Sequence, residues 1–217
     1  MGFEEERKEL VKSLEKNGYI KSESVKKAML KVKRENFVSS KFIEDAYIDI
    51  ALPIPGGGSI SQPAIHAISL ESLKLKPGET FLEIGAGSGI IEAYVSEIFG
   101  GKGKVIGTEI NKVTYEFGKK NLEKAGYKKV RFILIDGSAG LEEEAPFDRI
   151  LISAAGPDIP KPLIQQLKPG GKIVAIVGSY QGEQELVSLE KTKEEKIIRN
   201  KLLPVVFVPL RGKYGWK

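Results

Sequence analysis

Cysteine is absent from the 217 residues of the chain, and His66 is the only histidine. The lack of cysteine excludes disulfides, thiolate nucleophiles, iron–sulfur clusters and cysteine-ligated zinc. One imidazole is too few for a histidine-rich metal site, and it leaves at most one histidine for acid–base chemistry. We therefore expect no metal cofactor and a reaction that proceeds without a thiolate.

A block of one charge sign is also missing. The net charge is +5, but the 34 basic and 29 acidic side chains are interleaved, as in EEERKE and EKTKEEK. Such mixing is typical of a solvated surface and argues against nucleic acid as a partner. We see neither a signal peptide nor an apolar run long enough to cross a membrane, so we expect a cytoplasmic protein without membrane contact. No feature specifies an oligomeric state.

The hydrophobic pattern predicts a single domain over residues 1–217. Apolar residues recur at helical spacing in 3–14 and 22–32, whereas a Pro/Gly/Ser-rich stretch at 52–63 interrupts regular structure. The expected parts are an N-terminal helical extension (1–50), a loop and helix with substrate and cofactor contacts (51–76) and an α/β core (77–217).

Short apolar runs alternate with helical stretches along the core. This alternation predicts an α/β fold with a mostly parallel sheet and helices on both faces. The apolar run at 184–190 is expected to pair antiparallel with the last strand. The predicted strands are 80–85, 104–109, 130–135, 149–154, 172–177 and 205–210. The predicted helices of this region and the one before it are 64–75, 90–99, 112–125 and 160–167.

A glycine-rich loop, EIGAGSG, leaves the first strand of the core and opens a helix. Ligands in open α/β sheets bind at the carboxyl ends of the strands, and glycines there let the backbone approach them closely. A dinucleotide fingerprint reads GxGxxG, but here the third glycine comes one position early. An acid two places before GxGxG is instead typical of the Rossmann-like methyltransferases that use S-adenosylmethionine. The expected cofactor contacts are Glu83, Ile84, Gly85, Ala86, Gly87 and Gly89.

Two further acids follow the next strands. Glu109, followed by Ile110, ends the second strand of the core, where its carboxylate can accept hydrogen bonds from both ribose hydroxyls. Asp136, followed by Gly137, ends the third strand, where a carboxylate can accept a hydrogen bond from the adenine amino group. Either acid alone could be a helix N-cap, but together with the glycine loop they predict a nucleoside site.

Four stretches of the sequence carry a more specific pattern. They are DAYIDIALPIPGGGSISQP (45–63), LEIGAGSG (82–89), APFDRILISAAGPDIPKPLIQQLKPGGKIVAIVG (145–178) and FVPLRG (207–212). On these the chain resembles the protein-L-isoaspartate (D-aspartate) O-methyltransferase family, which repairs age-damaged proteins. The resemblance implies that Ser61 is the active-site serine. It also implies that Ser59, Ile60 and His66 lie against the cofactor.

Several of these positions have a second interpretation. Ser61 could be the N-cap of the following helix, and His66 could be a buried histidine that bonds to the backbone. Arg211 in FVPLRG could bind a carboxylate or be an exposed charge. Gly58 and Ser59 depart from the family pattern, where a polar residue and a threonine are usual. Serine keeps the hydroxyl, whereas Gly58 removes a side chain from the loop.

The expected reaction is methyl transfer from S-adenosylmethionine to the free α-carboxylate of L-isoaspartyl residues in damaged proteins and peptides. A carboxylate with a pKa of roughly 4 is ionised at neutral pH, so it needs no general base, metal or covalent intermediate. One alternative is a tRNA (adenine) methyltransferase of related fold. The segment Ala154-Ala155-Gly156-Pro157 lacks the Asn/Asp-Pro-Pro pattern typical of such enzymes. A second alternative is a cofactor-binding scaffold without activity.

Overall fold

The computed structural model describes residues 2–180 and 182–216. Its N-terminal helices α1 (Phe3–Lys16) and α2 (Glu23–Lys31) pack against each other, and α2 also packs against α4 (Ile90–Phe99). Ser22 is the N-cap of α2, and its hydroxyl accepts a hydrogen bond from the N–H of Val25 at 3.4 Å. The buried side chains of both helices join the apolar cluster that lies over one face of the sheet.

The elements of the core follow the predicted alternation of strands and helices. The helices are α3 (Pro63–Leu73), α4, α5 (Lys112–Ala125) and α6 (Lys161–Gln165), with 3₁₀ turns at Arg34–Asn36, Ser40–Asp45, Gly137–Ala139 and Glu142–Glu144. The strands are β1 (Leu52–Pro53), β2 (Ser59–Ile60), β3 (Thr80–Ile84), β4 (Lys104–Glu109), β5 (Arg131–Leu134), β6 (Phe147–Gly156), β7 (Leu167–Gly178), β8 (Gln184–Lys191) and β9 (Ile197–Val205).

The central sheet has the strand order β5-β4-β3-β6-β7-β8-β9. The five strands β5, β4, β3, β6 and β7 are parallel to one another, and β8 is antiparallel to both β7 and β9. This confirms a mostly parallel sheet with an antiparallel C-terminal addition. β3 lies between β4 and β6 in the sheet. The chain runs from β3 outwards to β4 and β5, and then returns to the opposite edge of β3 to form β6. A topological switch point, where ligands bind in open α/β sheets, therefore lies at the carboxyl end of β3.

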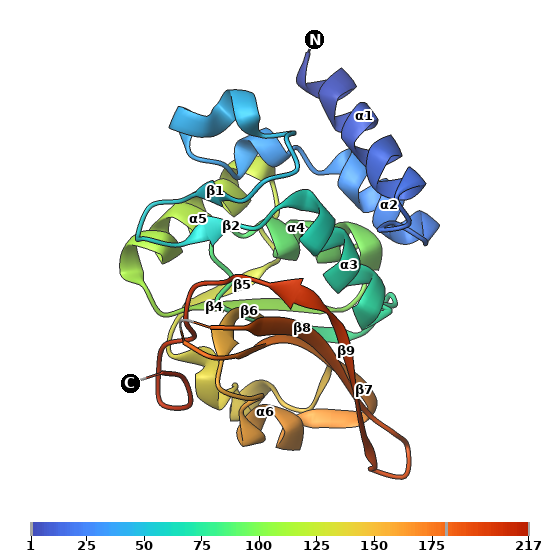
Figure 1. Cartoon of the computed structure of the whole chain (residues 1–217), viewed down its shortest axis with the longest axis vertical. Coiled ribbons are helices and arrows are strands. Elements are labelled where there is room, and N and C mark those ends of the chain that lie inside the picture. Colours follow the sequence, from blue (N-terminus) through green and yellow to red (C-terminus); the bar gives the residue numbers. More distant parts are fainter. Residues whose placement is uncertain (1, 181, 217) are drawn as a thin grey trace.

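Both faces of the sheet are covered, as predicted. Figure 1 shows α3, α4 and α5 on one side and the short helix α6 on the other. Successive side chains of β3 serve the two cores, because Phe81 belongs to the cluster beneath α4 and Leu82 to the opposite cluster. Buried residues on both faces explain why the parallel strands appear as nearly continuous apolar runs.

The last strand lies earlier in the chain than predicted. We expected 205–210, but β9 covers Ile197–Val205 and pairs with β8 as a hairpin. Its residues are mostly solvent-exposed, and its apolar residues come in adjacent pairs, Ile197-Ile198 and Leu202-Leu203, so the sequence does not show the alternation of a half-buried strand. The apolar segment that follows crosses the carboxyl end of β6 instead, where the N–H of Ala155 donates to the Val208 carbonyl at 2.9 Å.

Two general properties bear on function. No helix within residues 2–180 and 182–216 combines the length and apolar character that a bilayer-spanning segment needs. The same residues contain no group of three or more histidine, cysteine, aspartate or glutamate side chains arranged to hold a metal ion.

Candidate cofactor and substrate site

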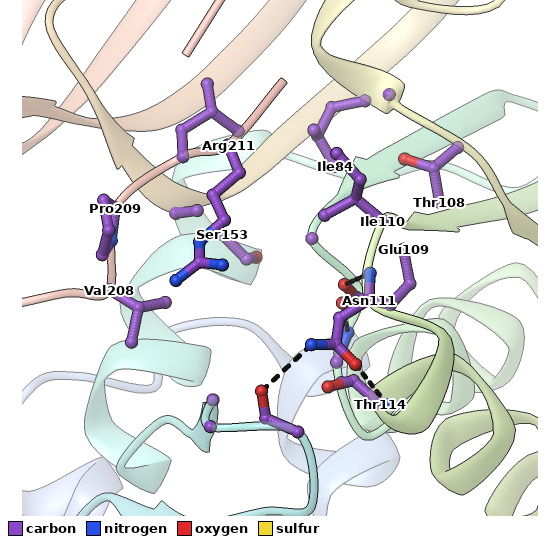
Figure 2. A pocket seen from close by; sticks show the side chains of 18 of the residues that line it. Ile84, Thr108, Glu109, Ile110, Asn111, Thr114, Ser153, Val208, Pro209 and Arg211 are labelled. Atoms are coloured by element: carbon purple, nitrogen blue, oxygen red, sulfur yellow. Dashed lines mark hydrogen bonds between the residues drawn. The ribbon is translucent and has the colours of Figure 1, made fainter. Parts of the chain in front are cut away.

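A cavity of about 380 Å³ opens at the carboxyl ends of β3, β4, β5 and β6 (Figure 2). Its size falls in the usual range for small-molecule sites, roughly 300–1,000 Å³. The β1–β2 hairpin and the C-terminal segment close the remaining sides. The lining residues come from segments 54–59, 84–87, 108–114, 135–137, 153–154 and 208–211.

The glycine loop after β3 forms the floor of this cavity. Gly85, Gly87 and Gly89 have φ angles of +77°, +58° and +82°, which L side chains rarely adopt. A Cβ on Gly89, the N-cap of α4, would lie 2.8 Å from the Leu122 side chain. Gly85 and Gly87 line the cavity, whereas Gly89 and Ala86 support the loop from behind. The glycines therefore let a ligand approach the backbone and the loop pack onto α5.

Glu109 is the acidic residue of the cavity wall. It ends β4 and is 8% exposed, and its carboxylate accepts the N–H of Asn111 at 2.8 Å and of Gly87 at 3.1 Å. These two bonds fix the side chain, and each carboxylate oxygen keeps a further lone pair. The fixed carboxylate can therefore accept two more hydrogen bonds from hydroxyl groups of a ligand.

The β1–β2 hairpin is attached to the start of α5. Asn111 caps this helix through its Oδ1, and its Nδ2 donates to the Gly56 carbonyl at 3.1 Å (Figure 2). Thr114 donates its hydroxyl to the Pro55 carbonyl at 2.9 Å. Gly56 has a φ of +95°, and a Cβ there would overlap Thr114 Oγ1. The sequence analysis missed Asn111 and Thr114, although an asparagine before a helix is a typical N-cap signal.

Beneath the loop lies a pair of buried carboxyl groups, Glu83 and Glu92. Burial and the nearby Glu92 carboxylate raise the pKa of Glu83 well above its usual value, and burial raises the pKa of Glu92 to about 7. Glu83 accepts a hydrogen bond from the Ser153 hydroxyl, and Ser153 lines the cavity. Glu83 therefore does not line the cavity itself and is connected to it by the hydrogen bond from Ser153. The sequence analysis did not predict Glu92 as part of the site.

Asp136 has other partners than the predicted adenine group. Its carboxylate accepts the N–H groups of Ser138 at 2.9 Å and Lys213 at 2.8 Å. Partial burial opposes ionisation, but the hydrogen bonds from Lys213 and Ser138 outweigh it and lower the pKa of Asp136. Asp136 does not line the cavity, whereas the adjacent Ile135 and Gly137 do. Contact with adenine stays a prediction, while the N-cap interpretation of Asp136 is confirmed.

Ser61 lies in the turn between β2 and α3. The N-cap interpretation of Ser61 was wrong, because Gln62 is the N-cap and Asp49 accepts the Ala64 N–H at 2.8 Å. The Ser61 carbonyl accepts a hydrogen bond from Arg34 Nη2 at 3.0 Å. Arg34 is buried and thereby connects the N-terminal extension with the serine turn.

His66 lies on α3, away from the cavity. Its Nδ1 is 3.5 Å from Arg34 Nη1, which donates to it, and burial together with the Arg34 charge lowers the pKa of His66 well below its usual value. The imidazole is therefore neutral at physiological pH. The expected bond to the backbone is replaced by this contact with Arg34, and the structure provides no cavity contact for His66.

The cavity thus brings together about half of the predicted cofactor residues. Those that line it are Ser59, Ile84, Gly85, Gly87, Glu109, Ile110 and Gly137. The predicted cofactor residues outside its lining are Ile60, His66, Glu83, Ala86, Gly89 and Asp136. The predicted active-site serine, Ser61, also lies outside it.

The whole chain matches one family of known proteins. Residues 5–215 match the model of the Protein-L-isoaspartate(D-aspartate) O-methyltransferase (PCMT) family. The chain belongs to this family. A protein-L-isoaspartate O-methyltransferase from Pyrococcus horikoshii is 46% identical over 210 residues, which are 97% of this chain and 94% of the relative. Another from Methanothermobacter thermautotrophicus is 44% identical over 213 residues, which are 98% of this chain and 98% of the relative.

Solved structures agree with this membership. A Plasmodium falciparum protein described as a beta-aspartate methyltransferase, solved in complex with S-adenosyl-L-homocysteine, has a TM-score of 0.84 and 28% identity. The match covers 94% of this chain and 98% of that protein. The resemblance drawn from the sequence is confirmed, and so is the methyltransferase fold. S-Adenosyl-L-homocysteine, which the Plasmodium falciparum protein binds, is the product left when S-adenosylmethionine gives up its methyl group.

Proposed function

We propose that this protein transfers the methyl group of S-adenosylmethionine to the free α-carboxylate of L-isoaspartyl residues in damaged proteins and peptides. The observation that carries the proposal is the family match over residues 5–215, which includes both the cavity and the ISQP turn. The same match leaves no specific support for a tRNA substrate. The cytoplasmic location expected from the sequence stays a prediction.

The residues of the cavity suit a methyl donor of this kind. S-Adenosylmethionine supplies a methyl group on a sulfonium, which is already a strong electrophile. The glycine loop allows close backbone contact, Glu109 can accept hydrogen bonds from the ribose hydroxyls, and Ile84 and Ile110 provide apolar walls. Two cofactor residues outside the lining support this wall: Gly89 lets the glycine loop pack onto α5, and Glu83 accepts a hydrogen bond from the lining residue Ser153. Direct cofactor contact of the others stays a prediction.

The acceptor needs positioning more than activation. An isoaspartyl carboxylate is ionised at neutral pH, so no proton has to be removed before its oxygen attacks. Holding the reacting groups together in the right orientation can lower a barrier by about 7–11 kcal/mol. We infer that the Ser61 hydroxyl donates a hydrogen bond to one carboxylate oxygen while the other oxygen accepts the methyl group. Ser61 is thus an orienting residue and not a nucleophile.

Paired peptides test the proposed function. One peptide carries an isoaspartyl residue, its twin carries a normal aspartyl residue, and both are incubated with methyl-labelled S-adenosylmethionine. We expect base-labile label in the isoaspartyl peptide alone. Equal labelling of both peptides, or of neither, contradicts the proposal. Bulk tRNA in a third reaction separates the adenine methyltransferase hypothesis, which requires base-stable label in the RNA.

Replacing Ser61 with alanine is expected to lower kcat for the isoaspartyl peptide about tenfold to thirtyfold, because the carboxylate is no longer held with its other oxygen directed at the methyl carbon. The affinity for S-adenosylhomocysteine should stay within twofold, because Ser61 does not line the cavity. Stopped-time methylation assays and calorimetry measure the two quantities. Ser24→Ala, at an exposed position on α2, is the matched control. Unchanged turnover in Ser61→Ala would remove Ser61 from the mechanism and leave the cofactor site as described.

A further inference from the structure

The C-terminal segment 208–216 holds Arg211 in a fixed position beside the cavity. On the side before Arg211, the N–H of Leu210 donates to the Ala155 carbonyl at 2.8 Å. Beyond it, the backbone N–H of Trp216 donates to the Leu210 carbonyl at 2.8 Å, and its indole N–H donates to the Ala155 carbonyl at 2.9 Å. Both flanks are therefore tied to the carboxyl end of β6.

A second anchor lies directly after Arg211. Asp136 accepts the N–H of Lys213 at 2.8 Å, and Gly212 passes so close to this carboxylate that a Cβ would overlap it. Gly212 also has a φ of +114°, which favours glycine. The backbone at Arg211 is thus defined by contacts on both sides, and its side chain starts from a fixed point.

The Arg211 side chain extends over the cavity. Figure 2 shows its guanidinium directed inward from the C-terminal segment, on the side opposite to Glu109. Among the lining residues, Glu109 and Arg211 are the charged ones. The ion pairs formed within residues 2–180 and 182–216 do not include Arg211. A guanidinium in this position is available to an anionic ligand.

We propose that Arg211 is the carboxylate-binding residue of this cavity and that it binds the acceptor carboxylate of the isoaspartyl residue. The inference rests on the proposed function. Arginine stays charged at all relevant pH values, and its N–H donors match carboxylate oxygens. Because Arg211 is solvent-exposed, it lies where the chain of a protein substrate can reach it. The carboxylate of the cofactor is the other possible source of the same chemical group.

The reaction predicts how such a contact affects the kinetics. The carboxylate oxygen forms a bond to the methyl carbon, the bond between carbon and sulfur breaks, and sulfur keeps that electron pair. The negative charge on the acceptor and the positive charge on sulfur both disappear. Arg211 therefore stabilises the bound carboxylate more than the transition state, in which this charge is already reduced. Loss of Arg211 should raise KM and leave kcat unchanged or slightly higher.

The test compares Arg211→Gln with the wild type in two assays. Steady-state methylation gives KM and kcat for an isoaspartyl peptide, and calorimetry gives Kd of that peptide for enzyme saturated with S-adenosylhomocysteine. We expect KM and Kd to rise about tenfold in Arg211→Gln, as for one hydrogen-bonded ion pair, with kcat within twofold. Arg211→Lys should lie between the two. Lys193→Gln, at an exposed position between β8 and β9, is the control and should match the wild type.

A peptide with an isoasparaginyl residue, in which an amide replaces the α-carboxylate, tests charge recognition directly. The wild type should bind the carboxylate peptide about tenfold better than the amide peptide, and Arg211→Gln should lose most of this preference. If Arg211→Gln weakens S-adenosylhomocysteine and leaves peptide binding unchanged, the carboxylate is that of the cofactor and our assignment to the acceptor is overturned. If neither ligand is affected, Arg211 binds no carboxylate. Failure of the wild type to methylate the peptide would instead contradict the proposed function, and the S-adenosylhomocysteine measurements would still report on Arg211.

Discussion

Replacing Glu109 with alanine is expected to weaken S-adenosylhomocysteine binding about a hundredfold, or about 2.7 kcal/mol. The carboxylate is buried, fixed by the N–H groups of Asn111 and Gly87, and has lone pairs left for two ribose hydroxyls. Hydrogen bonds to a charged acceptor contribute about 1.5–3 kcal/mol each, and part of the loss is recovered by water in the enlarged site. Calorimetry with the purified protein measures the change.

Two comparisons separate ribose binding from support of the glycine loop. Glu109→Gln keeps the shape and one acceptor oxygen, so about a tenfold loss is expected from the missing charge. A 2′-deoxy analogue of S-adenosylhomocysteine should bind the wild type much more weakly than the parent compound, but the two should bind Glu109→Ala almost equally. Glu116→Ala, at an exposed position on α5, is the control. If Glu109→Ala still discriminates against the deoxy analogue, Glu109 does not contact the ribose.

The parallel core and its switch point could be predicted from sequence because their signals are local. β3, β4, β6 and β7 are buried on both faces, so each appears as an apolar run ended by glycine or an acid. β9 could not be located in this way. Both faces of β9 are largely solvent-exposed, and its side chains Arg199 and Lys201 form ion pairs with Asp158 and Glu185. The strand therefore does not alternate between apolar and polar residues. Backbone pairing with the preceding strand β8 defines this strand, and the apolar pattern of residues 197–205 does not show that pairing.

The site shows the same division between local and long-range information. The glycine loop and Glu109 were found because strand, loop and acid are adjacent in sequence. One of the two partners of Asp136 is Lys213, 77 residues later, and Arg34 donates to the Ser61 carbonyl across 27 residues. No spacing rule indicates such contacts. His66 resembled a site residue because it follows the ISQP turn, but its position on α3 directs it towards Arg34 and into the core.

Glu92 is the largest departure from the pattern of a buried apolar helix face, and it predicts a pH effect on stability. The Glu92 side chain is 0% exposed, and its hydrogen-bond partner is another buried carboxyl group, Glu83, with no basic side chain among the described residues to balance the pair. It fits only because Gly107 on β4 has no side chain, since a Cβ there would overlap Glu92 Oε1. Burial raises the pKa of Glu92 from 4.5 to about 7. The folded chain therefore binds more protons than the unfolded chain between about pH 4.5 and 7.

The free energy of unfolding of the wild type should consequently fall as pH rises through this window. The contribution of Glu92 is fully present below pH 4.5 and is lost once the pH exceeds about 7. The loss is on the order of 3 kcal/mol for a shift of this size. Glu92→Leu has a similar volume and no charge to desolvate. It should therefore be more stable than the wild type at pH 8 by about 3 kcal/mol relative to their difference at pH 4.5.

Urea unfolding of both proteins at pH 4.5, 6 and 8 measures this difference, and the titrations of groups that do not interact with Glu92 cancel in it. Glu92→Gln should show the same pH dependence as Glu92→Leu, because both remove the ionisable group, whereas the exposed control Glu116→Gln should follow the wild type. Glu83 stays ionisable in every variant, but without Glu92 it no longer faces a second carboxyl group. The remaining slope of the variants therefore reports buried Glu83 together with other groups of shifted pKa, such as Glu79 and His66. A stability difference between wild type and Glu92→Leu that is constant from pH 4.5 to 8 would mean that Glu92 ionises as easily in the folded chain as in water.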